Sequence, residues 1–143
     1  MDVNFKEAAI RHFEDAEHLF VDGRNANAGQ LYGFCAECGL KALLVAYGLA
    51  TKANGDLQGN MRSNQFMKHI NGLVANVSTF SPADSTYFSY IAKVPNISAF
   101  TDWRVEHRYF LETALPTSHS AWRIAATQIR SMIDQAFLDG RIR

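Results

Sequence analysis

The stretch from Phe34 to Leu44 reads F-C-A-E-C-G-L-K-A-L-L, and the segment around it decides the fold. From residue 25 to residue 47, apolar side chains recur at intervals of three and four residues, which predicts one long helix. The apolar positions are Ala28, Leu31, Cys35, Cys38, Leu40, Ala42, Leu43, Leu44 and Val45. A stripe this wide predicts a central helix that is buried on more than one side. Glycines occur within it at positions 29, 33 and 39. Each costs about 1 kcal/mol relative to alanine, so we expect neighbouring elements to approach closely there.

The two cysteines of this stretch are expected to be structural. A zinc site needs four ligands, whereas Cys35 and Cys38 supply two and the chain has no other cysteine. His12, His18 and His69 could add ligands, but no H-x-x-x-H spacing supports that. A redox C-x-x-C pair gains its low thiol pKa at a helix N-terminus, and this pair lies in the middle of a predicted helix. We therefore predict that both side chains pack in the core and that the chain holds no metal.

The rest of the chain predicts further helices and no strand. The additional predicted helices cover residues 4–22, residues 64–77, a short segment from Ser81 to just before Pro95, and residues 118–139. Residues 51–60 are polar and glycine-containing, which predicts a loop, and residues 96–116 have no clean period. The sequence thus predicts a single domain over residues 1–143, an all-α, up-down bundle of four to five helices.

Composition and charge limit the possible functions. The chain is 48% apolar and 12% aromatic, which is ample for a core, and its 14 lysines and arginines equal its 14 aspartates and glutamates. With no net charge, binding to nucleic acid would need a local cluster of basic groups. The N-terminal residues lack the apolar run of a signal peptide, and no run is long enough to span a bilayer. Two cysteines without a secretion signal suggest a reducing compartment, so we expect a cytoplasmic protein with no membrane partner.

Several blocks of the sequence resemble the HEPN domain, a small helical bundle named for its occurrence in higher eukaryotes and prokaryotes. The first is A-x-x-H-F-x-D-A-x-x-L from Ala9 to Leu19, followed by the link Gly23-Arg24. The second is A-x-x-L-Y-x-x-x-A-E-x-x-L-K-A-L-L, which ends at Leu44. The blocks K-H-I-N-G-L-V at 68–74 and W-R-V-E-H-R-Y at 103–109 extend the similarity. The resemblance implies a HEPN-like fold.

The same resemblance implies two kinds of function. Many HEPN proteins are metal-independent endoribonucleases of toxin–antitoxin and phage-defence systems. Their site consists of an arginine and a histidine separated by four to six residues, and the histidine is often followed by x-Tyr. Two such sites typically meet across a homodimer interface. In such a site the histidine transfers the proton of the ribose 2′-OH, and the arginine stabilises charge on the phosphorane. Other members bind nucleotides beside a separately encoded nucleotidyltransferase.

Two arginine–histidine pairs in this chain approach the endoribonuclease pattern. The first consists of Arg104, His107 and Tyr109, in which only two residues separate the arginine from the histidine. On a helix, a three-residue offset still places both side chains on one face. The second pair, Arg62 and His69, has the six-residue gap, although Arg62 lies in a predicted loop. For each pair the alternative is a solvated or structurally hydrogen-bonded side chain.

Four further residues are candidate ligand-binding groups. Trp103 and Arg108 belong to the same segment as Tyr109, and aromatic side chains flanked by basic groups can stack on a base. The alternative is that these aromatics anchor an irregular loop to the core. Glu37 and Lys41 stand four apart within an apolar run, so burial would force both to find partners. The alternative for this pair is an ordinary ion pair on the surface of a helix.

The sequence therefore predicts a HEPN-like bundle that forms a homodimer, because the second helix is apolar on more sides than a small bundle covers internally. The expected function is an RNA-cleaving or RNA-binding effector of a toxin–antitoxin or defence system, without a cofactor. The alternative is a non-catalytic module that binds a nucleotide or small ligand, or a protein partner such as a nucleotidyltransferase or antitoxin.

Overall fold

The computed structural model describes residues 2–59 and 64–143. Within these ranges the chain forms helices and no β-strand, and an isolated bridge pairs Thr51 with Leu57. The α-helices are α1 (Phe5–Val21), α2 (Asn25–Ala46), α3 (Ile70–Leu73), α4 (Tyr87–Ile91) and α5 (His119–Leu138). The short 3-10 helices are η1 (Asn64–Phe66), η2 (Val77–Thr79), η3 (Ile97–Asp102), η4 (Val105–Tyr109) and η5 (Glu112–Ala114). No helix in this part of the chain has both the length and the apolar character needed to cross a membrane. The predicted all-α fold is confirmed.

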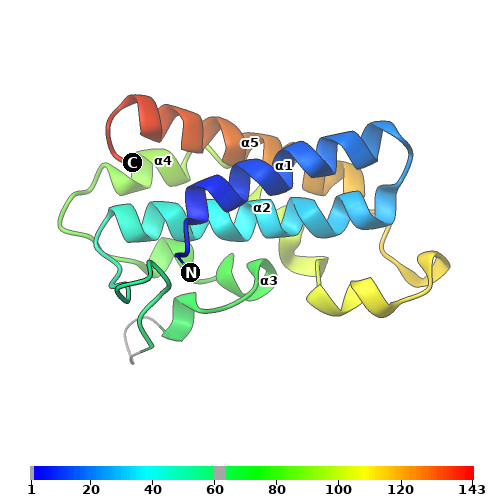
Figure 1. Ribbon diagram of the computed structural model, residues 1–143, viewed down its shortest axis with the longest axis horizontal. Coiled ribbons are helices and arrows are strands. Elements are labelled where there is room, and N and C mark those ends of the chain that lie inside the picture. The colour runs from blue at the N-terminus through cyan, green and yellow to red at the C-terminus, as the bar shows by residue number, and fades with distance from the viewer. Residues whose placement is uncertain (1, 60–63) are drawn as a thin grey trace.

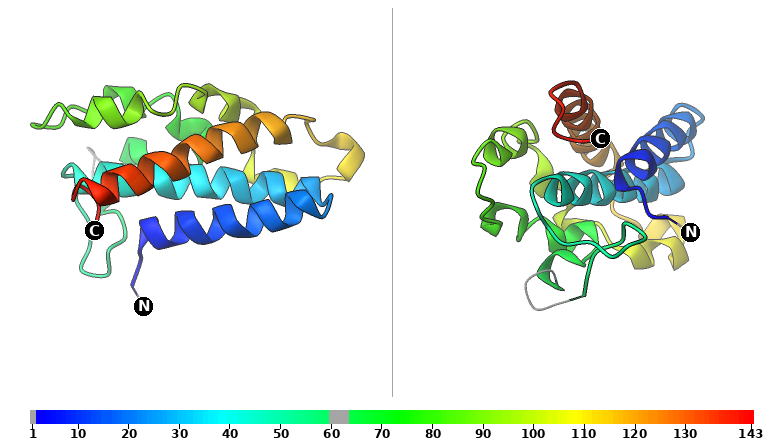
Figure 2. Two further views of the ribbon diagram at one scale, coloured as in Figure 1. Left: turned by 90° about the horizontal axis from the view of Figure 1, so that it is seen from above. Right: turned by 60° about the vertical axis from the view of Figure 1, so that its left-hand side comes forward.

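The three long helices lie side by side, with α2 in the centre. Figure 1 shows that α1 and α2 run in opposite directions, whereas α2 and α5 both begin at the same end of the bundle. The chain between α2 and α5 returns to that end through the short helices rather than through one long helix (Figure 2). This topology brings the N-termini of the two longest helices, and the η4–η5 segment that precedes α5, to one end of the molecule.

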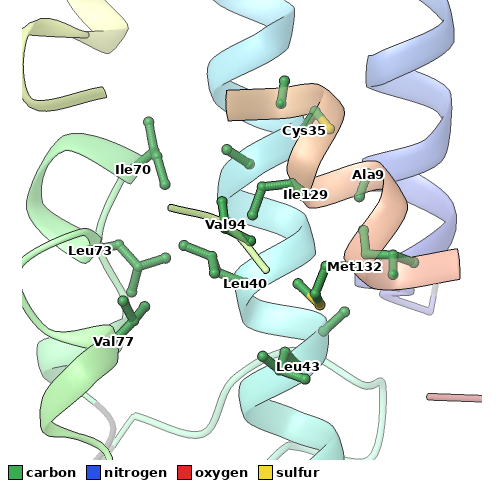
Figure 3. Packing of buried hydrophobic residues seen from close by; sticks show 14 of the residues in the cluster. Ala9, Cys35, Leu40, Leu43, Ile70, Leu73, Val77, Val94, Ile129 and Met132 are labelled. Carbon is green, nitrogen blue, oxygen red and sulfur yellow. The ribbon is translucent and has the colours of Figure 1, made fainter. Parts of the chain in front are cut away.

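Helix α2 is covered on all its apolar sides by other parts of the same chain. Its buried residues extend from Ala28 to Leu44. Figure 3 shows Leu40 and Leu43 between side chains from α5 and from the 70–77 segment, with Ala9 of α1 close by. The wide apolar stripe is therefore the centre of the core. The argument that α2 needs a second copy of the chain to cover it is wrong, although the homodimer itself stays a prediction.

The glycines of α2 are sites of close approach, as predicted. A Cβ at Gly29 would come within 2.9 Å of the Trp122 indole, and a Cβ at Gly39 would overlap Ile129 of α5. The Trp103 indole occupies the corresponding space beside Gly33. These three glycines therefore form notches along α2 into which two tryptophans and one isoleucine pack.

The turn between α1 and α2 sets where α2 begins. Gly23 has φ +78°, a left-handed conformation that L side chains rarely adopt. Its N–H donates to the Phe20 carbonyl, and the Arg24 N–H donates to the Leu19 carbonyl, at 3.0 and 2.8 Å. This pattern ends α1 in the usual way for a glycine after a helix, and α2 starts two residues later at Asn25. The first helix therefore ends within one residue of the predicted range, 4–22.

The helix predicted over residues 64–77 is wrong as a continuous element, because η1, α3 and η2 occupy that range. His69 has extended backbone angles, φ −68° and ψ 164°, which interrupt the helix. The Asn76 side chain donates to the carbonyls of Gln65 and Gly72 at 2.9 and 3.5 Å. Side-chain bonds of this kind compete with the helical backbone bonds. The apolar side chains of the segment nevertheless face α2 as the periodicity predicts (Figure 3).

The short helix predicted from Ser81 begins later than expected, at Tyr87 in α4. The Asp84 carboxylate accepts hydrogen bonds from the amide and the hydroxyl of Thr86, at 3.0 and 2.7 Å. These bonds stabilise a turn ahead of the helix, which is a common use of aspartate. The helix ends before Pro95, as predicted.

Candidate functional site

Trp103 is part of the core and is not available to stack on a base. Its side chain is 0% exposed. The indole N–H donates to the Gly29 carbonyl at 3.0 Å, and the Phe34 ring contacts the indole edge-on with centroids 5.4 Å apart. A buried tryptophan normally needs such a partner for its N–H. The packing interpretation of Trp103, as the anchor of an irregular segment, is the one the structure favours.

His107 lies in η4 and is buried, with 7% of its surface exposed. Its ring stacks on Trp122 of α5, with centroids 6.2 Å apart and 23° between the planes. The Nδ1 atom accepts a hydrogen bond from the backbone N–H of Arg104 at 3.4 Å. Burial, and secondarily the charge of Arg104, lower the pKa of His107 below its ordinary value of 6.5. Both effects favour the neutral imidazole at pH 7.

The hydrogen bond to Nδ1 decides what the neutral His107 ring can do. A neutral imidazole carries one proton, and when Nδ1 accepts a hydrogen bond that proton is on Nε2. Nε2 has no hydrogen-bond partner among the described residues, and it is not fully enclosed. In this state Nε2 donates a hydrogen bond to a bound group. It cannot accept the proton of a ribose 2′-OH, so the arrangement favours binding over general-base catalysis.

The side chains of Arg104 and Tyr109 form no described hydrogen bond with the His107 ring, although the Arg104 backbone N–H does. Arg104 is exposed, and its carbonyl accepts a hydrogen bond from the Gln30 side chain at 3.0 Å, which ties η4 to α2. Tyr109 is 76% exposed. The guanidinium carbon of Arg108 lies 4.8 Å from the centroid of the Tyr109 ring. Tyr109 and Arg108 thus form an exposed aromatic–cation pair next to the buried histidine.

A cavity of about 200 Å³ opens beside His107. Its wall includes the first residues of α2, Asn25 and Ala26, and the first residue of α5, His119. The remaining lining residues are Gly23, Glu112, Leu115, Pro116, Thr117 and Trp122. An adjoining hollow is lined by Arg108 and shares residues 23, 26, 112 and 115 with the first. The two hollows therefore connect Arg108, which contacts the Tyr109 ring, with the His107 ring along the end of the bundle.

Glu37 and Lys41 form a partly buried ion pair on α2, and the structure adds a third member to it. Both side chains are 12% exposed, with Nζ 3.4 Å from one Glu37 oxygen. The other Glu37 oxygen lies 2.8 Å from Nδ1 of His69. The expectation that burial would force these groups to find partners is confirmed. The cluster binds the start of α3 to α2, and none of the three residues lines the His107 cavity.

Of the second arginine–histidine pair, only His69 lies within the described residues. Arg62 lies outside the described residues. His69 uses Nδ1 to contact Glu37, and its ring lies 6.4 Å from the Trp103 ring. The structurally hydrogen-bonded alternative therefore accounts for His69.

The cysteines have the environment of structural thiols. Cys35 is fully buried in the core, and burial raises its pKa far above the ordinary value. Cys38 is partly buried, and burial together with the Glu37 charge raises its pKa to about 11. A redox thiol needs a lowered pKa, so these values do not suit a redox pair. This environment favours the structural interpretation of both residues.

The structure also shows a polar cluster that the sequence did not indicate. Arg123 of α5 makes two hydrogen bonds to the Glu17 carboxylate, at 2.9 and 2.8 Å. The Tyr32 hydroxyl donates to the same carboxylate at 2.6 Å, so the cluster links α1, α2 and α5. The guanidinium also lies over the Phe20 ring, 4.4 Å from its centroid. Glu17 follows Ala16 of the buried stripe, and this position next to the stripe is the only sequence signal that could have indicated its role.

Comparison of the chain with models of known protein families, with curated proteins and with solved structures gives no match.

Proposed function

We propose that this chain is a HEPN-like module that binds single-stranded RNA at the end of the bundle where α2 and α5 begin. In this proposal Tyr109 and Arg108 hold a base, and His107 donates a hydrogen bond from the adjoining cavity. The observation that carries the proposal is the exposure of Tyr109, 76%, beneath the guanidinium of Arg108. Large aromatic side chains are seldom left this exposed without a partner, and an aromatic ring paired with arginine suits base stacking.

The charge distribution agrees with a small, local binding site. The whole chain has no net charge, so it provides no long-range attraction to RNA. Arg24 and Arg108 nevertheless line one hollow at this end of the bundle, and Arg104 precedes the η4 segment that carries Arg108. Because Arg24 is paired with Asp22 at 2.8 Å, Arg104 and Arg108 supply the local positive charge that a nucleic-acid partner needs. Such a site suits a short stretch of RNA better than a long duplex.

Binding of fluorescently labelled single-stranded RNA, followed by anisotropy, tests the proposal. Stacking on an aromatic ring contributes about 1–3 kcal/mol per base, so Tyr109→Ala should weaken binding about tenfold or more. Tyr109→Phe keeps the ring and should bind nearly as the wild type does. Leu111→Ala is the matched control, since Leu111 is equally exposed, at 78%, and offers no ring. Equal affinity of the wild type and Tyr109→Ala would contradict the proposal.

RNA cleavage is tested separately, in excess EDTA. Because Nε2 of His107 carries the proton in the observed arrangement, we expect RNA to be bound and not cut. Metal-independent cleavage that His107→Gln abolishes would show that the ring changes its hydrogen bonding on binding RNA. It would then accept the 2′-OH proton as the 2′-oxygen bonds to phosphorus and the bond to the 5′-oxygen breaks, and the imidazolium would return a proton to that leaving oxygen. That result would replace the binding function by an endoribonuclease function.

A nucleotide-binding module that partners a nucleotidyltransferase is the second candidate. The observation that favours it is the size of the His107 cavity, about 200 Å³, which fits part of one nucleotide. The two candidates differ in the ligand that binds best. A mononucleotide that binds as tightly as an RNA of several nucleotides would favour the second candidate, and affinity that rises with RNA length would favour the first.

A further inference from the structure

We infer that the His107 cavity is a phosphate site, formed by the N-termini of α2 and α5 together with Nε2 of His107. The inference deepens the proposed function, and rests on it, by naming the chemical group that the cavity takes. That group is a phosphate, either free or as part of a nucleotide. Three independent features of the cavity support it, and each concerns hydrogen-bond donors that have no partner among the described residues.

The first feature is the start of α2. The first intrahelical bond runs from the Ala28 amide to the Arg24 carbonyl, at 3.0 Å, and the helix has no side-chain cap. The amides of residues 25–27 have no hydrogen-bond partner among the described residues. The first turn contains no acidic residue either. A helix of 22 residues presents a partial positive charge at such an end, and unpaired amides there bind anions readily.

The second feature is the start of α5, which reaches the same cavity. Its N-cap residue, Ser118, makes no capping bond, because its hydroxyl donates instead to the Asp102 carboxylate. The amides of residues 119–121 likewise have no partner among the described residues. Figure 1 shows that the two long helices begin at the same end of the bundle, and the first residues of both line this cavity. A single unpaired helix start is common, but two that share a cavity are not explained by packing.

The third feature is His107 itself. The side chain is more than nine-tenths buried, and its Nδ1 accepts a hydrogen bond from the Arg104 amide. Nε2, on the opposite side of the ring, has no partner in residues 2–59 and 64–143. Because His107 lines the cavity, this Nε2–H is a donor available to a group bound there. The cavity volume of about 200 Å³ compares with about 30 Å³ for one water molecule, so it has room for a phosphate.

Two acidic residues lie near the site and limit its affinity. Asp102 contacts Ser118 and the Trp122 indole N–H, so part of its charge is already engaged at the start of α5. Glu112 lines the cavity from η5 and is exposed to solvent, where its charge is screened. Because these two carboxylates oppose the attraction of the two helix N-termini for an anion, we expect selective rather than tight binding of phosphate.

The test is an NMR titration of the histidine ring protons with inorganic phosphate, repeated with a nucleoside monophosphate. Chloride at matched ionic strength is the reference, and His107→Gln identifies the His107 signal. The decisive variant is Asn25→Asp, which places a carboxylate in the first turn of α2. A carboxylate there stabilises the helix, so the variant folds, yet it should weaken phosphate binding on the order of tenfold. Asn71→Asp is the control, with the same change of charge at an exposed position outside the cavity.

The expected result is a saturable shift of the His107 signal in the wild type and in Asn71→Asp, and a much weaker one in Asn25→Asp. Tighter binding of the nucleotide than of inorganic phosphate would show that the rest of the nucleotide also makes contacts. A His107 signal that phosphate does not shift, or that shifts equally in Asn25→Asp, would overturn the inference. The RNA-binding function would survive that result if Tyr109-dependent RNA binding were observed. Phosphate binding without RNA binding would support the phosphate site and contradict the proposed RNA-binding function.

Discussion

The indole of Trp103 lies directly against Gly33, in space that the Cβ of any other residue would occupy. The indole N–H also bonds to the Gly29 carbonyl, one turn earlier on α2. This contact fixes the segment that carries His107, Arg108 and Tyr109 onto the central helix. It therefore joins the core of the bundle to the candidate binding site.

Substitution of Gly33 by alanine should destabilise the fold. The added methyl group would overlap the Trp103 ring, and overpacking of a core typically costs about 1–3 kcal/mol. Denaturant unfolding measures the change. Gly59→Ala is the control, because a Cβ at Gly59 meets no atom within 4 Å, and its stability should stay within about 0.5 kcal/mol of the wild type. Equal stability of the two variants would show that the tryptophan is not held in the notch.

The Glu17–Arg123 pair should make stability depend on pH in the acid range. The hydrogen bonds from Arg123 lower the pKa of Glu17 below its ordinary value of 4.5. The unfolded chain therefore binds the proton more readily, so the stabilisation is complete above pH 4.5 and is lost as pH falls through the lowered pKa of the folded state. Since both side chains are partly exposed, we expect a contribution of about 1 kcal/mol.

Glu17→Gln tests this expectation in urea unfolding at pH 7 and at pH 3. The variant should be less stable than the wild type at pH 7, and the difference should shrink at pH 3. Glu14→Gln serves as the comparison, because the Glu14 carboxylate is mostly exposed and its contact with Arg130 is long, at 3.5 Å. A difference between wild type and Glu17→Gln that is constant with pH would rule out the carboxylate as its source.

The thiols should be unreactive in the folded protein. Cys35 is buried and has a raised pKa, and the pKa of Cys38 is about 11, so both are protonated at pH 7. A thiol reagent such as dithionitrobenzoate should label neither residue quickly until the protein is unfolded. Replacing both with alanine should cost about 1–3 kcal/mol, most of it from Cys35, and leave ligand binding intact. Rapid labelling of native Cys38 at pH 7, or zinc that copurifies and is lost in the double variant, would contradict a purely structural role.

The charge of Arg104 should contribute measurably to the low pKa of His107. Desolvation is the larger cause and the Arg104 charge the next, so Arg104→Gln should raise the pKa of His107. The NMR titration of the His107 ring protons reads this directly, without any activity. Arg108→Gln is the control, since the Arg108 charge is not among the causes of the shift. A pKa that is the same in Arg104→Gln and in the wild type would mean that burial alone lowers it.

The homodimer stays a prediction, but its interface should not involve α2. Since α2 is covered within the chain, a second copy would contact exposed apolar residues elsewhere, such as Ile124 of α5, which is 55% exposed. Light scattering before and after dilution determines the oligomeric state of the protein. If the protein is a dimer through this face of α5, Ile124→Glu should shift it to a monomer without unfolding it. If the wild type is a monomer at every concentration measured, a binding site formed jointly by two copies of the chain is excluded.

The long helices could be predicted closely from the sequence, because their apolar periodicity is sustained and their ends carry clear signals. The first predicted helix, 4–22, corresponds to α1 at Phe5–Val21, and the last, 118–139, corresponds to α5 at His119–Leu138. The 64–77 segment has an equally regular apolar pattern, yet it breaks into short pieces. There the bonds from the Asn76 side chain outcompete helical ones, and apolar spacing alone does not reveal such competition.

The candidate site could be located from the sequence only as a segment. The composition of residues 103–109 indicated the segment that carries the candidate site. It did not indicate which of these side chains are buried and which are exposed, and this determines the role of each. Trp103 and His107 turn toward α2 and α5, whereas Tyr109 turns to solvent. The cavity itself could not be predicted, because its walls come from residues 25, 26, 107 and 119, which are far apart in the sequence.

The two tryptophans that fill the notches of α2 have a consequence for how this surface can evolve. Trp103 at Gly33 and Trp122 at Gly29 fasten both ends of an intervening stretch that contributes little else to the core. Most side chains between them can therefore be exchanged while the scaffold remains folded. Substitutions at positions 104–118 can therefore change which ligand is bound, while the long helices stay folded with little loss of stability.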